Sequence, residues 1–132
     1  MAARSVRFQA TAFPAARMRT IGEALVTSIK ERLARGQTIY DAAAPPLREK
    51  YAKYKQRKKG SSLRDWNFQG RTLRGMRVTN ATAGRAIVSF SDPVAGMRAA
   101  INNRRVRQFG VSGVNREAIR PLFVNPAIVQ AR

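Results

Sequence analysis

The longest regular pattern in the chain is MRTIGEALVTSIKERL, which occupies residues 18–33. Its apolar side chains recur at steps of three and four residues, and this spacing places them on one stripe of an α-helix. The stripe comprises Met18, Ile21, Leu25, Ile29 and Leu33. We expect it to pack into the protein core.

Both ends of this helix carry the usual end signals. Pro14 suits the first turn, and Gly36 suits the position just past the last turn. Arg32 and Arg35 fall in the last turn, where the helix dipole favours positive charge. The sequence therefore predicts a helix over residues 14–36.

Shorter patterns follow this helix. Pro45-Pro46 precede a basic helical segment, and Gly60-Ser-Ser interrupts it. Two short strands around the turn Ala81–Gly84 predict a hairpin, and Asp92-Pro93 has the composition of a helix start. The expected elements are an N-terminal arm or edge strand (1–13), a helix (14–36), a basic helix (45–59), a loop (60–70), a hairpin (76–91), a third helix (93–109) and an extended C-terminal tail (110–132).

This order of elements predicts an α+β fold. A length of 132 residues suits one domain over 1–132 with a modest core. Residues 71–76 have room for one or two helical turns, and Trp66 and Phe68 are expected to anchor a loop to the core. Leu122–Val124 is the strand-like stretch of the tail.

The balance of charge is unusual. Twenty-six Lys and Arg side chains oppose seven Asp and Glu, which gives a net charge of +19 and a pI of about 11.9. Such a chain repels itself and is drawn to polyanions. The partners that carry enough negative charge are nucleic acid, an anionic membrane surface and an acidic protein.

The sequence lacks the residue types on which most catalytic and metal sites depend. It has no Cys and no His, and its seven carboxylates are scattered without a recognisable motif. We therefore expect no enzyme activity, metal, cofactor or small-molecule substrate. No apolar run of transmembrane length and no signal peptide is apparent, so we expect no membrane partner and an intracellular site of synthesis.

The positive charge concentrates between Arg48 and Arg74, where ten Lys and Arg side chains accompany two acidic ones. Such cations neutralise phosphates without reading sequence, and interleaved aromatic rings can stack on bases. For Tyr51 and Tyr54 we favour a position in the core. For the cations we favour proximity to DNA or an acidic partner over simple solvation. The residues proposed for that role are Lys53, Lys55, Arg57, Lys58, Lys59 and Arg64.

A second basic cluster accompanies the third helix. It consists of Arg98, Arg104, Arg105 and Arg107. Contact with phosphate and the alternative, solvation with salt bridges between subunits, fit this pattern equally well. No zinc finger, basic zipper or ribonucleoprotein motif is present, so nothing predicts sequence-specific reading of DNA.

Four passages carry a family resemblance. The first is Thr27–Arg32, and the second runs from Ala44 to Lys55. The third is Gly70–Met76, directly before the hairpin, and the fourth is Gln108-Phe-Gly110 followed by Ile119–Phe123. In this order the passages resemble the virion-morphogenesis and tail-completion proteins of tailed bacteriophages, which join head to tail and are similar to the phage Mu G protein family.

The resemblance implies a structural virion protein of the phage neck, with no catalysis. It would form a ring of six or twelve copies at the head–tail junction, as a connector or tail terminator around the DNA channel. The implied partners are copies of the chain itself, portal or adaptor and tail proteins, and packaged double-stranded DNA. The implied location is the virion, with assembly in the host cytoplasm.

Two other functions fit the same residues. One is a free, sequence-independent nucleic-acid-binding protein, associated with the ribosome or the nucleoid. The other is a capsid or baseplate part whose basic face meets acidic protein.

Overall fold

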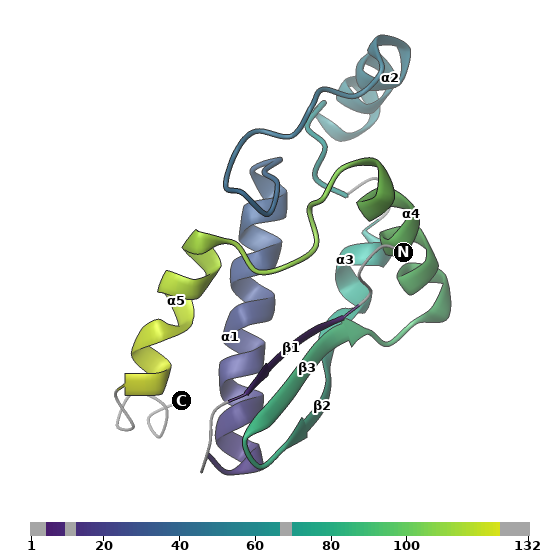
Figure 1. Cartoon of the computed structure of the whole chain (residues 1–132). Helices are drawn as coiled ribbons and strands as arrows, with labels where there is room; N and C mark the ends of the chain where they lie inside the picture. The colour runs from purple at the N-terminus through teal and green to yellow at the C-terminus, as the bar shows by residue number, and fades with distance from the viewer. Residues whose placement is uncertain (1–4, 10–12, 67–69, 125–132) are drawn as a thin grey trace.

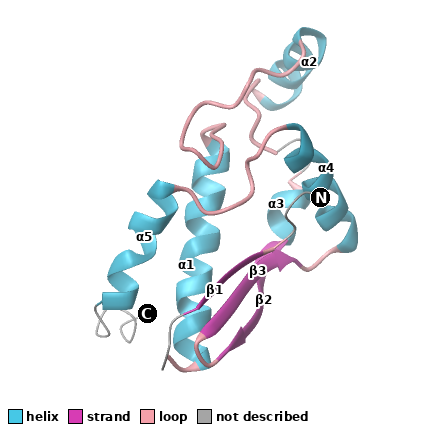
Figure 2. Ribbon diagram, in the orientation of Figure 1, coloured by secondary structure: helices cyan, strands magenta, loops and turns pink. Residues whose placement is uncertain are grey.

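A long helix, α1, forms the spine of the protein in the computed structural model (Figure 1). The structure describes residues 5–9, 13–66 and 70–124. In chain order the elements are β1 (Val6–Gln9), α1 (Ala15–Ala34), α2 (Glu49–Lys59), α3 (Arg71–Gly75), β2 (Met76–Thr82), β3 (Arg85–Phe90), α4 (Pro93–Arg105) and α5 (Gly113–Val124). Figure 2 shows α1 lying between α5 and a small sheet, so the expected α+β class is confirmed.

Helix α1 follows its predicted bounds closely. Pro14 precedes the first turn, and Gly36 adopts a φ of +66° just past the last one. Glycine suits this position because an L side chain is strained there. The five stripe residues are completely buried: Met18, Ile21, Leu25, Ile29 and Leu33. The predicted helix and its core stripe are therefore confirmed.

The sheet has three antiparallel strands in the order β1-β3-β2. The expected hairpin is formed by β2 and β3, and β1 pairs with the other edge of β3. The N-terminal segment therefore supplies an edge strand, which was one of its two expected forms. Helix α1 crosses the hairpin closely, because a Cβ added to Gly22 would lie 2.7 Å from Val78 Cγ2. A larger residue at this position would force the Val78 side chain to move.

Helices α3 and α4 cover one end of the hairpin. The carboxylate of Asp92 accepts a hydrogen bond from the Val94 N–H at 2.9 Å, with Pro93 at the first helical position, as the sequence predicts. A Cβ added to Gly75 would lie 2.8 Å from Ala95 Cβ. Small residues therefore set the distance between α3 and α4.

Helix α4 ends at Arg105, earlier than the predicted residue 109. The side-chain oxygen of Asn103 accepts hydrogen bonds from the N–H groups of Gln108 and Phe109, at 2.8 and 2.9 Å, and so holds a turn in the chain. Phe109 then enters the core beside Phe90, with ring centroids 5.1 Å apart. A local side-chain acceptor thus replaces the last helical turn.

The C-terminal segment differs from the prediction. Residues 113–124 form helix α5 instead of an extended tail, and the stretch expected as a strand is its last turn. Pro121 lies inside this helix and removes one backbone donor, a feature that argues against a helix although the apolar residues of the segment keep helical spacing. Ile119 and Leu122 are buried in the core that α1 also lines, so packing stabilises the helix. Residues 125–132 of the predicted tail lie outside the described residues.

Helix α5 begins in a set of reciprocal hydrogen bonds. Ser112 Oγ accepts from the Asn115 N–H at 3.2 Å, and Asn115 Oδ1 accepts from the Ser112 N–H at 3.0 Å. This is a capping box. Asp41 Oδ2 accepts from the Val114 N–H at 3.0 Å. Burial alone would raise the pKa of Asp41, but the hydrogen bonds it accepts and the charge of Arg32 outweigh burial and hold that pKa below its usual value.

The side chain of Arg32 connects the surrounding segments and is completely buried. It donates hydrogen bonds to Asn115 Oδ1 at 3.0 Å, to the Gln37 carbonyl at 3.2 Å and to the Gly110 carbonyl at 2.8 Å. Burial lowers the pKa of Arg32, and the nearby Asp41 carboxylate partly offsets this. Arg32 does lie in the last turn of α1, as expected, and in addition it ties α1 to the following loop and to α5.

Replacing Arg32 with Met retains part of the side-chain volume but removes three hydrogen bonds, among them the one that the Gly110 carbonyl accepts. Because a buried polar group without a partner costs about 1–3 kcal/mol, we expect the free energy of unfolding to fall by about 2–4 kcal/mol. Urea titration followed by circular dichroism measures it. Arg35→Met, a change at the exposed neighbour, should alter it by no more than about 0.5 kcal/mol. Equal losses in both variants would contradict the connecting role of Arg32.

Candidate functional site

Helix α2 projects beyond the end of α1, away from the sheet (Figure 1). We call α2 and the loop 60–66 that folds back along it the arm. Four of the basic residues proposed from the sequence lie exposed on α2: Lys53, Arg57, Lys58 and Lys59. Lys53 pairs with Glu49 at 3.0 Å, and both side chains are more than 70% exposed (73% and 83%), so this pair contributes little to stability. The arm therefore presents cations to solvent along its length.

Lys55 differs from its neighbours, since only 2% of its surface is exposed. Its ammonium group donates to the Leu63 carbonyl and forms an ion pair with the Asp65 carboxylate. Lys55 therefore holds the loop against α2, and its charge is neutralised within the chain. The sequence-based expectation that this residue faces a polyanion is corrected here: Lys55 is a structural residue of the arm.

The tyrosines of α2 also differ from the preferred prediction. Tyr51 is 42% exposed and Tyr54 is 40% exposed, so the expected position of both in the core is wrong. Lys55 is the one buried residue of this helix and takes the position that faces the loop. The aromatic rings are left at the surface of the arm.

The base of the arm is joined to the body by polar side chains. Arg64 donates to the carbonyls of Pro45 and Pro46 at 3.0 and 3.3 Å, which closes the two ends of the arm on each other. The indole N–H of Trp66 donates to Gln108 Oε1 at 3.1 Å, and Gln108 Nε2 donates to the Arg64 carbonyl at 2.6 Å. Trp66 thus anchors the loop as predicted, whereas Phe68 lies outside the described residues.

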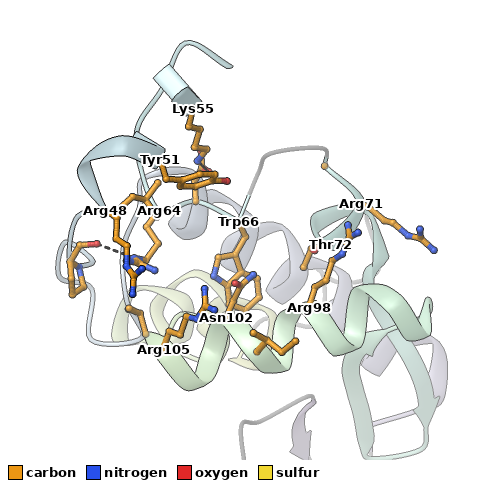
Figure 3. Close-up of a pocket in the computed structure, with 16 residues that line it drawn as sticks. Arg48, Tyr51, Lys55, Arg64, Trp66, Arg71, Thr72, Arg98, Asn102 and Arg105 are labelled. Atoms are coloured by element: carbon orange, nitrogen blue, oxygen red, sulfur yellow. Dashed lines mark hydrogen bonds and ion pairs between the residues drawn. The ribbon is translucent and has the colours of Figure 1, made fainter. Parts of the chain in front are cut away.

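A cleft of about 930 Å³ lies between the arm, α3 and α4 (Figure 3). We call it the arginine cleft, because five arginines line it together with Tyr51 and Trp66. In Figure 3, Arg98, Asn102 and Arg105 project from α4 into this space. The five arginines are Arg48, Arg64, Arg71, Arg98 and Arg105.

The cleft brings together residues from the two basic clusters that the sequence places far apart. Lys55 and Arg64 come from the first cluster, and Arg98 and Arg105 come from the second. The remaining members are exposed and do not line it: Lys53, Arg57, Lys58, Lys59, Arg104 and Arg107. Sequence reasoning counted Arg48 and Arg71 in the basic region without assigning them a role.

Most of the positive charge in the cleft lacks a compensating carboxylate. Arg71 pairs with Asp92 at 2.5 Å, and the hydrogen bond between them raises the pKa of Arg71 and lowers that of Asp92. Arg64 donates only to carbonyls. Three others form no hydrogen bond or ion pair with the described residues through their side chains: Arg48, Arg98 and Arg105. Four guanidinium groups therefore leave a positive potential that attracts anions.

The part of the chain that the structure describes contains neither a metal-binding cluster nor a membrane-spanning helix. Within the ranges 5–9, 13–66 and 70–124 there is no group of three or more side chains suited to hold a metal ion. No helix in these ranges is both long enough and apolar enough to cross a membrane.

Comparison with known proteins gives no match: no family model, no curated protein and no solved structure is significantly similar to this chain.

Replacing Lys55 with Met removes the ion pair and hydrogen bond that hold the loop on α2. We expect backbone amides of residues 61–66 to exchange with solvent about tenfold faster or more, because a charged hydrogen bond contributes about 1.5–3 kcal/mol. Hydrogen-exchange mass spectrometry measures this directly. Lys53→Met, which removes an exposed lysine from the same helix, should leave these rates unchanged. Unaltered exchange in Lys55→Met would show that other contacts hold the loop.

Proposed function

We propose that this chain is a structural subunit of a bacteriophage neck, which forms a ring at the head–tail junction with its arm near packaged double-stranded DNA or an acidic neighbouring ring. The proposal rests on the exposed cations of the arm, which projects from the body. Contacts of this kind bind phosphates through charge and counterion release. The family resemblance supplies the specific location.

Assembly into a ring agrees with the surface and the charge of one copy. Large apolar side chains remain exposed on the body, among them Tyr40 at 70%, Met97 at 53% and Val114 at 48%. These offer apolar area that a neighbouring copy could cover. With a net charge of +19 each, however, copies repel one another unless salt or a polyanion screens them. A subunit of this type would assemble most readily around DNA.

A free, sequence-independent nucleic-acid-binding protein is the second candidate. One observation favours it: both the arm and the arginine cleft are complete within a single copy. Such a protein needs no ring in order to bind. Its affinity would depend steeply on salt, because each neutralised phosphate contributes about 0.9 to the slope of log K against log salt.

Sedimentation velocity and duplex binding separate these two candidates. For a neck subunit we expect a ring of defined size under either of two conditions. One is about 1 M salt, where the Debye length is about 3 Å and repulsion between copies is screened. The other is lower salt in the presence of short duplex DNA. Duplex binding by the isolated copy should be weak. A protein that stays monomeric under both conditions and binds duplex tightly would contradict the neck assignment and support the second candidate.

Neutralising the arm tests where duplex DNA binds. The variant changes Lys53, Arg57, Lys58 and Lys59 to Gln. We expect the salt slope for duplex binding to decrease by about 0.9 for each phosphate that the arm no longer neutralises, up to about 3–4 in total. The matched control changes four exposed arginines outside the arm to Gln: Arg19, Arg77, Arg116 and Arg120. Equal effects of the two variants would mean that net charge, and not the arm, governs binding.

A further inference from the structure

The arginine cleft differs from the outer surface of the arm in being concave and partly aromatic. Arg98, Asn102 and Arg105 line one wall from a single face of α4, at i, i+4 and i+7. Arg48 and Arg64 lie on the side of the arm (Figure 3). Guanidinium groups thus stand on both sides of the space, which suits a ligand that carries more than one negative group.

The spacing along α4 fits a row of phosphates. A rise of about 1.5 Å per residue separates Arg98 from Arg105 by about 10 Å along the helix axis. Successive phosphates of one flexible strand can engage both arginines, whereas a single bound phosphate would leave one of them without a partner.

The lining of the cleft includes flat and apolar groups beside the cations. Tyr51 is 42% exposed and Ile101 is 37% exposed, and both line this space together with Leu47 and Trp66. An aromatic ring next to arginines is the arrangement that binds single-stranded nucleic acid, because every base offers a face on which to stack. An acidic peptide needs the cations but makes no particular use of the aromatic ring.

The size of the cleft sets a limit on the ligand. A volume of about 930 Å³ lies near the upper end of the range for pockets that enclose a small ligand, about 300–1,000 Å³. A few nucleotides of one strand fit such a space. A double helix cannot be enclosed in a space of this volume.

We infer that the arginine cleft binds a short stretch of a single nucleic-acid strand, with phosphates on Arg48, Arg64, Arg98 and Arg105 and a base against Tyr51. This inference rests on the part of the proposed function that places the chain beside nucleic acid, but it needs no ring. It also assigns different ligands to two surfaces: duplex to the outside of the arm and single strand to the cleft.

Binding of a labelled oligothymidine to the full-length chain, followed by fluorescence anisotropy, tests the inference. Arg98→Gln with Arg105→Gln should weaken binding by roughly tenfold or more for each arginine that contacts a phosphate. The matched control, Arg104→Gln with Arg107→Gln, removes the same charge from exposed neighbours outside the cleft and should have a much smaller effect. Equal reductions in both double variants would overturn the inference.

Tyr51→Ala separates stacking from charge. Removal of a base-stacking ring should weaken single-strand binding by roughly tenfold and leave duplex binding by the arm unchanged. Since Trp66 is the chain's only tryptophan and lines the cleft, its fluorescence should also respond to oligothymidine. Unchanged single-strand affinity in Tyr51→Ala would overturn the assignment of a stacked single strand to the cleft. Displacement of oligothymidine by polyglutamate, at equal charge and equal concentration, would overturn it in favour of an acidic protein.

Failure here is distinguishable from failure of the proposed function. If the cleft variants leave single-strand binding intact while rings form and the arm variant lowers the duplex salt slope, the cleft inference alone is wrong. The opposite result is that no ring forms, that the arm variant behaves like its control, and that the cleft variants no longer bind single strands. In that case the neck assignment fails and the cleft inference stands.

Discussion

The buried guanidinium of Arg32 is the constraint on which the rest of the structure depends. A charge without contact to water must be surrounded by oxygen acceptors, and here they come from Gln37, Gly110 and Asn115. These acceptors lie in the loop after α1, before α5 and inside α5. The hydrogen bonds of this one side chain of α1 therefore fix the positions of the following loop and of the segment that leads into α5. Asn115 also donates to Ser28 Oγ at 2.7 Å, so α5 is bound to α1 at a second point.

A continuous path of hydrogen bonds extends from this centre to the arm. The Gln37 carbonyl accepts from Arg32 and, at 3.4 Å, from Gln108 Nε2. Gln108 in turn binds the Arg64 carbonyl and the indole of Trp66. Because buried networks of this kind are rigid only when each member is satisfied, the orientation of the arm depends on contacts made deep in the body. The arm is positioned by these polar groups and by the ring of Trp66, which packs against the core beside Phe109.

The extent to which the sequence predicts this fold follows from the range of each interaction. Helix α1 is predictable because its stripe is local and regular, and the cap at Asp92 is predictable because its acceptor and donor are two residues apart. Helix α5 was missed although its apolar residues keep helical spacing, because Gly113 and Pro121 are typical of loops and because its stability comes from burial beside a helix about a hundred residues away. No spacing rule conveys that contact.

The candidate site was predictable in composition but not in geometry. The density of charge in residues 48–74 marks the region. Within it, however, one lysine is a buried structural residue and another is exposed to solvent. Lys55 is buried because Asp65 and the Leu63 carbonyl return to it, whereas Lys53 two residues earlier is solvated. The arginine cleft joins α4 to the arm across about forty residues of sequence, and the contacts of Gln108 and Trp66 help to make them neighbours.

The cleft also has an electrostatic consequence for the protein without a ligand. Guanidinium groups on opposite walls of the cleft repel one another, and the repulsion is stronger where the walls exclude water. Among the described residues that line the cleft, the carboxylate of Asp65 is paired with Lys55, so the repulsion among the four remaining arginines favours separation of the arm from α4. It is opposed by the hydrogen bonds of Arg64 and Trp66 at the base of the arm. An anion between the walls reverses the sign of this interaction, so it would stabilise the arm and fill the cleft at the same time.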